Sequence, residues 1–243
     1  SGSYHSLFCD GGDCFVMSSG TMYQVAADGS LAVVTTGLQD TKMSYVQVGE
    51  ITYYANGFDL GRVYQGVNEA WSKGTYYGPD THRVFSGPVP GNHLAVFFGR
   101  MLIAKDNVLW WSEPYNFDLY DQSASFVQFH TDIRMIKPVD GGLYLSTDNK
   151  TYFLNGRSPI EWVPRTVCSY PAVEGSDSVT YIDGADVGLD PGPYALWASR
   201  EGVIMGSSTG VVTNINKRKI IYPENARSGF GMLVGTNFIH GVE

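Results

Sequence analysis

The stretch GRMLIAKDNVLWWSE, residues 99–113, has the pattern that decides the fold. A glycine opens it, an apolar run follows, Lys-Asp-Asn forms a polar break, and a second apolar run carries aromatic residues. Two apolar runs joined by residues that accept a positive φ predict a β-hairpin. The pattern recurs as GDCFVMSSGTMYQV (12–25), GEITYYANGFDLGRV (49–63), GGLYLSTDNKTYFLN (141–155), EGVIMGSSTGVVTNI (201–215) and GTNFIHGVE (235–243).

The spacing of these copies matches the blade of a β-propeller. The first and last copies begin at Gly12 and Gly235, five intervals apart, so one repeat is about 45 residues long, as in a four-stranded blade. An apolar run that precedes each hairpin predicts a further strand. These runs are 5–9, 43–48, 94–98, 133–139, 195–199 and 229–234.

A fourth strand is visible in some units, at 30–35, 126–129 and 160–163. We therefore predict an all-β chain, a β-propeller of four-stranded blades with five full units and the first half of a sixth. The alternative is a five-bladed ring in which the last strand pair joins the amino-terminal segment.

Composition supports one globular β domain over residues 1–243. Hydrophobic residues make up 43% of the chain and charged residues 16%, and there are 29 glycines. This balance is typical of a turn-rich globular protein and excludes disorder and coiled coil. Residues 72–92 and 168–194 are predicted to be long connections between strands, and loops of this size often carry function.

The formal net charge of −8 argues against a protein that tracks nucleic-acid phosphates, because such binding needs a basic face. The only basic cluster, Lys217, Arg218 and Lys219, is interpreted as a solvated turn between two strands. We predict no direct sequence-specific nucleic-acid binding. No apolar run reaches 18 residues, so no membrane span is predicted.

Three cysteines are too few for a disulfide scaffold. Cys9 and Cys14 flank the predicted turn Asp-Gly-Gly-Asp and could face one another across a hairpin. Buried free thiols are the preferred interpretation, although the sequence leaves the bonding state open. Cys168 has no other cysteine near it in the sequence.

A search for catalytic and metal-binding motifs predicts no catalytic, cofactor-binding or metal-binding residue. None of the five histidines falls in a nucleophile motif, and zinc-ligand spacing is absent. Asp183, Asp186 and Asp190 offer oxygen ligands suitable for calcium, but their spacing matches no EF-hand, so solvated turn carboxylates are favoured. The segment 146–152 resembles the Asp-box turn of sialidases, with Lys150 in place of the glycine.

The densest aromatic group is Trp110, Trp111 and Tyr115. Strand alternation places Trp110 and Trp111 on opposite faces of the sheet, so at most one of them is expected to be exposed. An exposed tryptophan could stack on a sugar or anchor a protein partner. Packing between blades is the default expectation for both.

The run from Gly99 to Asp118, with its Trp-Trp-Ser-Glu-Pro-Tyr-Asn segment, resembles a blade common in phage virion proteins. The run from Leu196 to Gly206, followed by Thr-Gly-Val-Val, is similar to a later blade of the same proteins. The resemblance covers most of residues 43–243. It implies a structural part of a virion, such as a tail, nozzle or baseplate component, although the known nozzle proteins are much longer.

These observations lead to three functional hypotheses. The first is a non-enzymatic phage structural protein that docks other virion proteins, forms a symmetric homo-oligomer in the particle and is assembled in the host cytoplasm. The second is a glycan-binding propeller that recognises a host surface through Trp110 or Trp111 and residues 168–194. The third is a sialidase-like glycosidase with channel carboxylates such as Asp106, Asp148 and Asp183.

Overall fold

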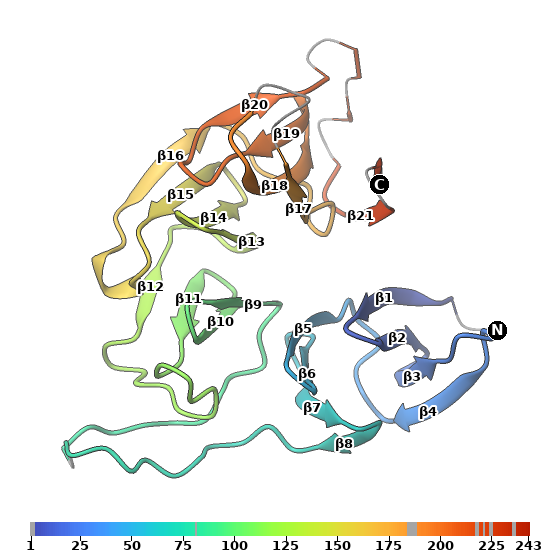
Figure 1. Cartoon of the computed structure of the whole chain (residues 1–243), viewed down its shortest axis with the longest axis vertical. Coiled ribbons are helices and arrows are strands. Elements are labelled where there is room, and N and C mark those ends of the chain that lie inside the picture. The colour runs from blue at the N-terminus through green and yellow to red at the C-terminus, as the bar shows by residue number, and fades with distance from the viewer. Residues whose placement is uncertain are drawn as a thin grey trace. The chain divides into compact units, whose positions relative to one another are not determined.

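The computed structural model describes residues 3–80, 82–183, 189–216, 219–220, 222–223, 226–234 and 237–243 (Figure 1). In these residues the chain is built from 22 β-strands and one short 3₁₀ turn, Pro159–Glu161. The chain divides into two compact units, Ser1–Val127 and Gln128–Glu243. No helix in the described residues is long and apolar enough to cross a membrane.

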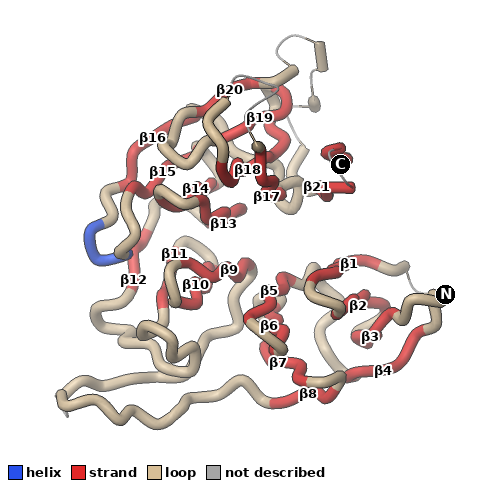
Figure 2. The backbone as a smooth tube through the Cα atoms, viewed as in Figure 1, coloured by secondary structure: helices blue, strands red, loops and turns tan. Residues whose placement is uncertain are grey.

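The first unit holds three antiparallel four-stranded sheets, in which neighbouring strands follow one another along the chain. Their strands are β1 (His5–Asp10), β2 (Asp13–Ser18), β3 (Thr21–Val25), β4 (Leu31–Thr35), β5 (Ser44–Val48), β6 (Ile51–Ala55), β7 (Leu60–Tyr64), β8 (Val67–Glu69), β9 (His93–Phe97), β10 (Arg100–Lys105), β11 (Val108–Trp111) and β12 (Phe126–Gln128). Figure 2 shows the long strand-free connection between β8 and β9.

The second unit holds two four-stranded sheets and one two-stranded sheet. Their strands are β13 (Ile133–Val139), β14 (Gly142–Thr147), β15 (Thr151–Asn155), β16 (Pro164–Cys168), β17 (Ser178–Ile182), β18 (Gly192–Ser199), β19 (Gly202–Gly206), β20 (Val212–Asn214), β21 (Gly229–Val234) and β22 (Asn237–Val242). The structure thus has five full sheets and a two-stranded sixth, which is the number that the repeat predicts. Gly235, where the sixth copy begins, lies outside the described residues.

In the fifth sheet, the predicted order of the strands is wrong by one position. The run 195–199 belongs to β18, which is the second strand of its sheet, because β17 pairs with it along Ser178–Ile182. Residues 168–194 are therefore not only a connection. The strand SVTYI was missed because it is short and lies among glycines, prolines and aspartates, where composition favours a loop.

The strand predicted at 160–163 is also wrong. Pro159 begins the 3₁₀ turn, and the strand β16 starts only at Pro164. Proline fixes φ near −65° and suits the first position of a helical turn. Trp162 closes this turn, because its indole Nε1 donates to the carbonyl of Gly156 at 3.0 Å.

The second strand of each full sheet is its most buried element. All six residues of β14 are buried, and the central four of β10 are buried as well. Each such strand is paired at both edges and packed on both faces, so its apolar side chains meet protein on every side. In the second unit, Tyr144 and Trp197 form the centre of the core, with ring centroids 5.2 Å apart.

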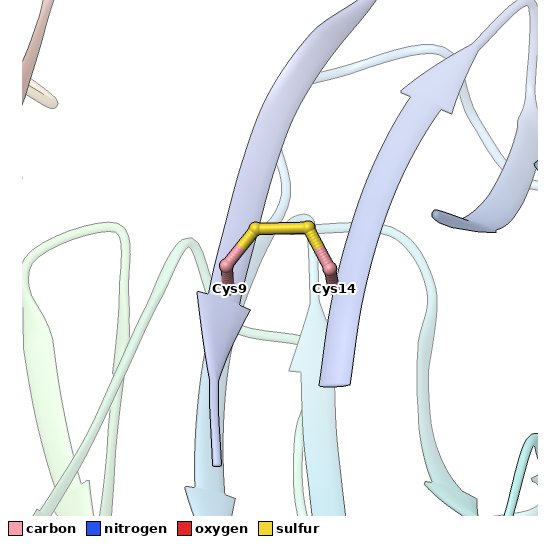
Figure 3. Close-up of a disulfide and its surroundings, with 2 residues drawn as sticks. All are labelled: Cys9 and Cys14. Carbon is pink, nitrogen blue, oxygen red and sulfur yellow. A yellow bond between two sulfur atoms is a disulfide. The ribbon is translucent and has the colours of Figure 1, made fainter. Parts of the chain in front are cut away.

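The two amino-terminal cysteines form a disulfide (Figure 3), so the interpretation as buried free thiols is wrong. Cys9 on β1 and Cys14 on β2 are directly opposite one another in the strand register. Cys9 is exposed and Cys14 is half-buried. Direct cross-strand pairs bring their Cβ atoms close together, which allows the bond to form. Cys168 is a free and buried thiol, and burial raises its pKa.

Candidate docking surface

The β8–β9 loop, residues 70–92, packs on the β11–β12 loop, residues 112–125. The indole Nε1 of Trp71 donates to the carbonyl of Phe117 at 3.1 Å. Ser86 and Tyr120 exchange two backbone hydrogen bonds, at 2.8 and 3.0 Å. Two well-separated points of the long β8–β9 loop are therefore tied to the middle of the β11–β12 loop.

An ion pair between Arg83 and Glu113 also joins the β8–β9 loop to the start of the β11–β12 loop. Two guanidinium nitrogens of Arg83 donate to the two carboxylate oxygens of Glu113, at 2.9 and 2.6 Å. Such a two-point contact fixes orientation as well as distance. The hydrogen bonds from Arg83 to Glu113 raise the pKa of Arg83. Asp121 lies 3.5 Å from the same guanidinium, and its pKa is lowered by its hydrogen bond from Ser123 and, to a smaller extent, by Arg83.

The run that resembles phage virion proteins builds the base of this surface. The hydroxyl of Ser112 accepts the backbone N–H of Met101 at 3.0 Å and donates to the carbonyl of Glu113 at 2.9 Å. The backbone N–H of Tyr115 donates to the carbonyl of Gly99 at 2.6 Å. Gly99 has φ +72°, and a Cβ atom there would lie 2.7 Å from the Tyr115 ring. Glycine is thus required both by the turn and by the ring above it.

Three large apolar side chains are exposed around this base: Val84, Phe98 and Tyr115, with exposed fractions of 81%, 45% and 85%. Val84 follows Arg83, and Phe98 precedes Gly99, on which the Tyr115 ring lies. Val84 and Phe98 are each next in sequence to a residue of this base, and Tyr115 belongs to it, so we name these three residues the docking patch. Exposed aromatic side chains on a fixed base are typical anchors for a protein partner.

The three aromatic residues singled out from the sequence have different environments. Trp111 is only 4% exposed, Trp110 is half-buried and tilted against Phe126 at 5.1 Å, and Tyr115 is exposed. Trp111 therefore belongs to the core, whereas Tyr115 is the residue available to a ligand. Sequence reasoning missed Val84 and Phe98, and their exposure has no signal in the local pattern.

The carboxylates considered for calcium or glycoside chemistry do not gather in the described residues. Asp106 is in the exposed β10–β11 turn, and Asp148 pairs with Arg134 in the β14–β15 turn. Asp183 and Asp190 are exposed, while Asp186 lies outside the described residues. In the part of the chain that the structure describes, no group of three or more metal-ligating side chains is found. Of the basic cluster, Lys217 and Arg218 lie outside the described residues and Lys219 is exposed.

A cavity of about 290 Å³ lies in the second unit, beside Asp148, Tyr170 and Arg200. Three of its polar residues already have contacts within the protein. Asp148 pairs with Arg134, the carbonyl of Tyr170 accepts the hydroxyl of Thr151, and the Arg200 guanidinium lies 6.0 Å from the Tyr170 ring centroid. The volume is at the lower end of the range for small-molecule sites. The docking patch is therefore the stronger candidate.

Comparison with known proteins places this fold in a structural class. No protein-family model matches the chain, and no curated protein is similar to it in sequence. Among solved structures, it is similar to a catalytically inactive virginiamycin B lyase from Staphylococcus aureus with quinupristin, at a TM-score of 0.55 and 11% identity over 99% of this chain and 84% of that one. It is also similar to the WD40 β-propeller domain of Doa1, at a TM-score of 0.53 and 11% identity over 87% and 67%.

The chain has a β-propeller fold. Identity near 11% shows the fold alone, and one fold can serve many unrelated functions, so the fold does not decide what this chain does. Nothing in these comparisons indicates a virion protein. That assignment stays a prediction.

Proposed function

We propose that this propeller is a non-enzymatic structural protein of a phage particle, and that it docks other virion proteins through the docking patch. The observation that carries the proposal is the structure of the run from Gly99 to Asp118. This run resembles phage virion proteins, and it forms the base on which Phe98 and Tyr115 are displayed.

The side chains of this run act within the protein. Glu113 is held by two guanidinium nitrogens of Arg83, and the Ser112 hydroxyl is hydrogen-bonded to the backbone of Met101 and Glu113. Such groups fix the shape of a loop before a partner arrives. A loop that is ordered in advance loses less conformational entropy on binding, which favours a docking role.

Symmetric assembly in the particle is part of the proposal, because virion proteins are used in repeated copies related by rotation axes. A partner would cover Val84 and Tyr115, whose exposed fractions of 81% and 85% leave their rings and methyl groups in water. Burying these side chains supplies the main driving force for association.

The test is co-purification. The gene for this chain is expressed together with each neighbouring gene, and tagged protein is purified and analysed by mass spectrometry. We expect a portal, tail-tube or tape-measure product to co-purify. A chain that binds none of its neighbours' products, and is absent from purified particles, would overturn the proposal.

A glycan array tests the alternative function, in which the ligand is a glycan and not a virion protein. Purified protein is applied to the array together with a Tyr115→Ala variant. Glycan binding that the variant loses would favour host-surface recognition over docking to virion proteins. Absence of binding on the array, combined with co-purification, supports docking.

A further inference from the structure

The cavity in the second unit lies where four connections between strands meet, namely β14–β15, β16–β17, β18–β19 and β20–β21. The first three connections supply its polar lining, in which Asn149, Ser169 and Arg200 are exposed and Asp148 and Tyr170 are half-buried. The cavity is thus open to solvent on one side and lined by side chains that can form hydrogen bonds with a ligand.

The backbone that lines the cavity is held by neighbouring strands. The N–H of Ala172 donates to the hydroxyl of Ser146 at 2.8 Å, and the N–H of Val173 donates to the carbonyl of Ala198 at 2.9 Å. The cavity is therefore formed before a ligand arrives, so that binding costs little ordering of the chain. The same bonds occupy these two N–H groups, and a ligand has to be bound by side chains.

Arg200 has two guanidinium nitrogens left for a ligand. Its Nε lies 3.6 Å from the Glu201 carboxylate, and its two terminal nitrogens have no hydrogen-bond partner in the described residues. The guanidinium lies over the Tyr170 ring, with its carbon 6.0 Å from the ring centroid. A guanidinium with both terminal nitrogens free matches the two oxygens of a carboxylate.

Two further side chains of the lining are free to bind a ligand. The Asn149 amide and the Ser169 hydroxyl form no hydrogen bond within the part of the chain that the structure describes. An amide and a hydroxyl can each donate and accept, so both suit the hydroxyl groups of a ligand. Pro171 is half-buried in the same lining and offers apolar surface to a carbon skeleton.

The charges around the cavity favour a ligand with one negative charge. Asp148 is paired with Arg134, and Arg200 lies near Glu201, so the two cations are already balanced by two carboxylates. A doubly charged phosphate would be repelled by both carboxylates. Phosphate sites also use several free backbone N–H groups, and the two N–H groups of this lining that are described above already have acceptors.

We propose that this cavity binds a small hydroxy acid, a molecule with one carboxylate and several hydroxyl groups. Arg200 binds the carboxylate, and Asn149 and Ser169 bind hydroxyl groups of the same molecule. The volume of about 290 Å³ has room for one small molecule and is below that of most drug-sized sites. The docking patch belongs to the first unit and the cavity to the second, so the co-purification result does not decide this inference.

Nuclear magnetic resonance of the full chain tests the proposal, with glucuronate as the probe. Glucose is the matched control, because it has the same ring and lacks the carboxylate. We expect saturable shifts at the amides of Asn149, Ser169 and Arg200, with a dissociation constant of about 0.1–10 mM for glucuronate. Glucose should bind at least about threefold more weakly, a modest factor because solvent screens the half-exposed guanidinium.

An Arg200→Gln variant removes the charge and keeps a hydrogen-bonding group. We expect it to weaken glucuronate binding at least about threefold and to abolish the preference over glucose. Arg157→Gln is the matched control, because Arg157 is also exposed in the second unit and does not line the cavity. It should change binding less than about twofold. The comparison of the two sugars on the unmodified chain gives an answer even where a variant fails to fold.

Four results would overturn the proposal. The first is the absence of a saturable shift at these amides up to about 50 mM glucuronate. The second is equal binding of glucose, which would show that the carboxylate is not recognised. The third is acetate binding as tightly as glucuronate, which would show that the hydroxyl groups contribute nothing. The fourth is tighter binding of inorganic phosphate at the same amides, which would make the cavity a phosphate site.

Discussion

The strands β14 and β22 are both the second strand of their sheets, and their environments are opposite. Every residue of β14 is buried, whereas β22 alternates between exposed and half-buried over its first four residues and has no buried residue. β14 has partner strands at both edges, and β22 has one in the described residues. Burial of a propeller strand is thus supplied by its neighbours more than by its own sequence.

The largest expected effect comes from the core between the full sheets. Trp197 on β18 is fully buried against Tyr144, so we expect Trp197→Ala to lower the free energy of unfolding by about 3–5 kcal/mol. Urea unfolding followed by circular dichroism measures this change. Phe230→Ala on β21 is the comparison. We expect it to lower the free energy of unfolding by less than about 1 kcal/mol, because the ring is exposed.

Trp197→Phe sharpens this prediction. The indole Nε1 of Trp197 is buried and has no hydrogen-bond partner in the described residues. Removing an unsatisfied donor recovers part of its desolvation cost, so we expect Trp197→Phe to cost about 1 kcal/mol. Equal losses for the alanine and phenylalanine variants would show that the aromatic packing contributes little.

The sequence predicted the hairpins well because their signals are local. Asp106 and Gly57 occupy turn positions with φ of +52° and +88°, and such residues are recognisable from type alone. The strand β17 was missed because SVTYI has few residues and lies in a loop-like segment. Arg83 and Glu113 are 30 residues apart, so no local pattern could predict their contact or the patch above it.

Removing the disulfide is expected to have an intermediate effect on stability. It allows a comparison of the β1–β2 hairpin of the first sheet with the β21–β22 hairpin of the last. The β1–β2 hairpin is cross-linked by Cys9 and Cys14, while β21–β22 has no cysteine. Closing so short a loop contributes about 2 kcal/mol in the chain-entropy model. We expect the Cys9→Ser, Cys14→Ser double variant to lose about this much in thermal or urea unfolding. Reduction of the unmodified protein should give the same loss, and a difference between the two would point to the serines themselves.

Acidification is expected to destabilise the two-stranded β21–β22 sheet and to leave the stability of the β13–β16 sheet unchanged. Burial lowers the pKa of His240 below its ordinary value of 6.5, so the unfolded hairpin binds a proton more readily than the folded one. Stability from the neutral ring is present above about pH 6.5 and is lost as the pH falls toward the lowered pKa. Residues 133–168 contain no histidine.

Hydrogen exchange measures this difference. Rates at β22 and β14, corrected for intrinsic exchange, are compared between about pH 7.5 and about pH 5.5. Protection should fall at β22 only, and a His240→Gln variant should remove the pH dependence. Equal loss of protection in both strands would mean that acid acts on the whole unit and not on His240.

Replacing Tyr115 is expected to have the smallest effect on stability and the largest effect on binding. Its side chain is 85% exposed above a base built by Gly99 and the Arg83–Glu113 pair, so Tyr115→Ala should change the free energy of unfolding by less than about 0.5 kcal/mol. Loss of an aromatic anchor should weaken partner co-purification at least about tenfold. Tyr181→Ala on β17 is the matched control, because that ring is also exposed, at 73%. If both variants weaken binding equally, general surface apolarity drives association, and the docking patch has no special part in it.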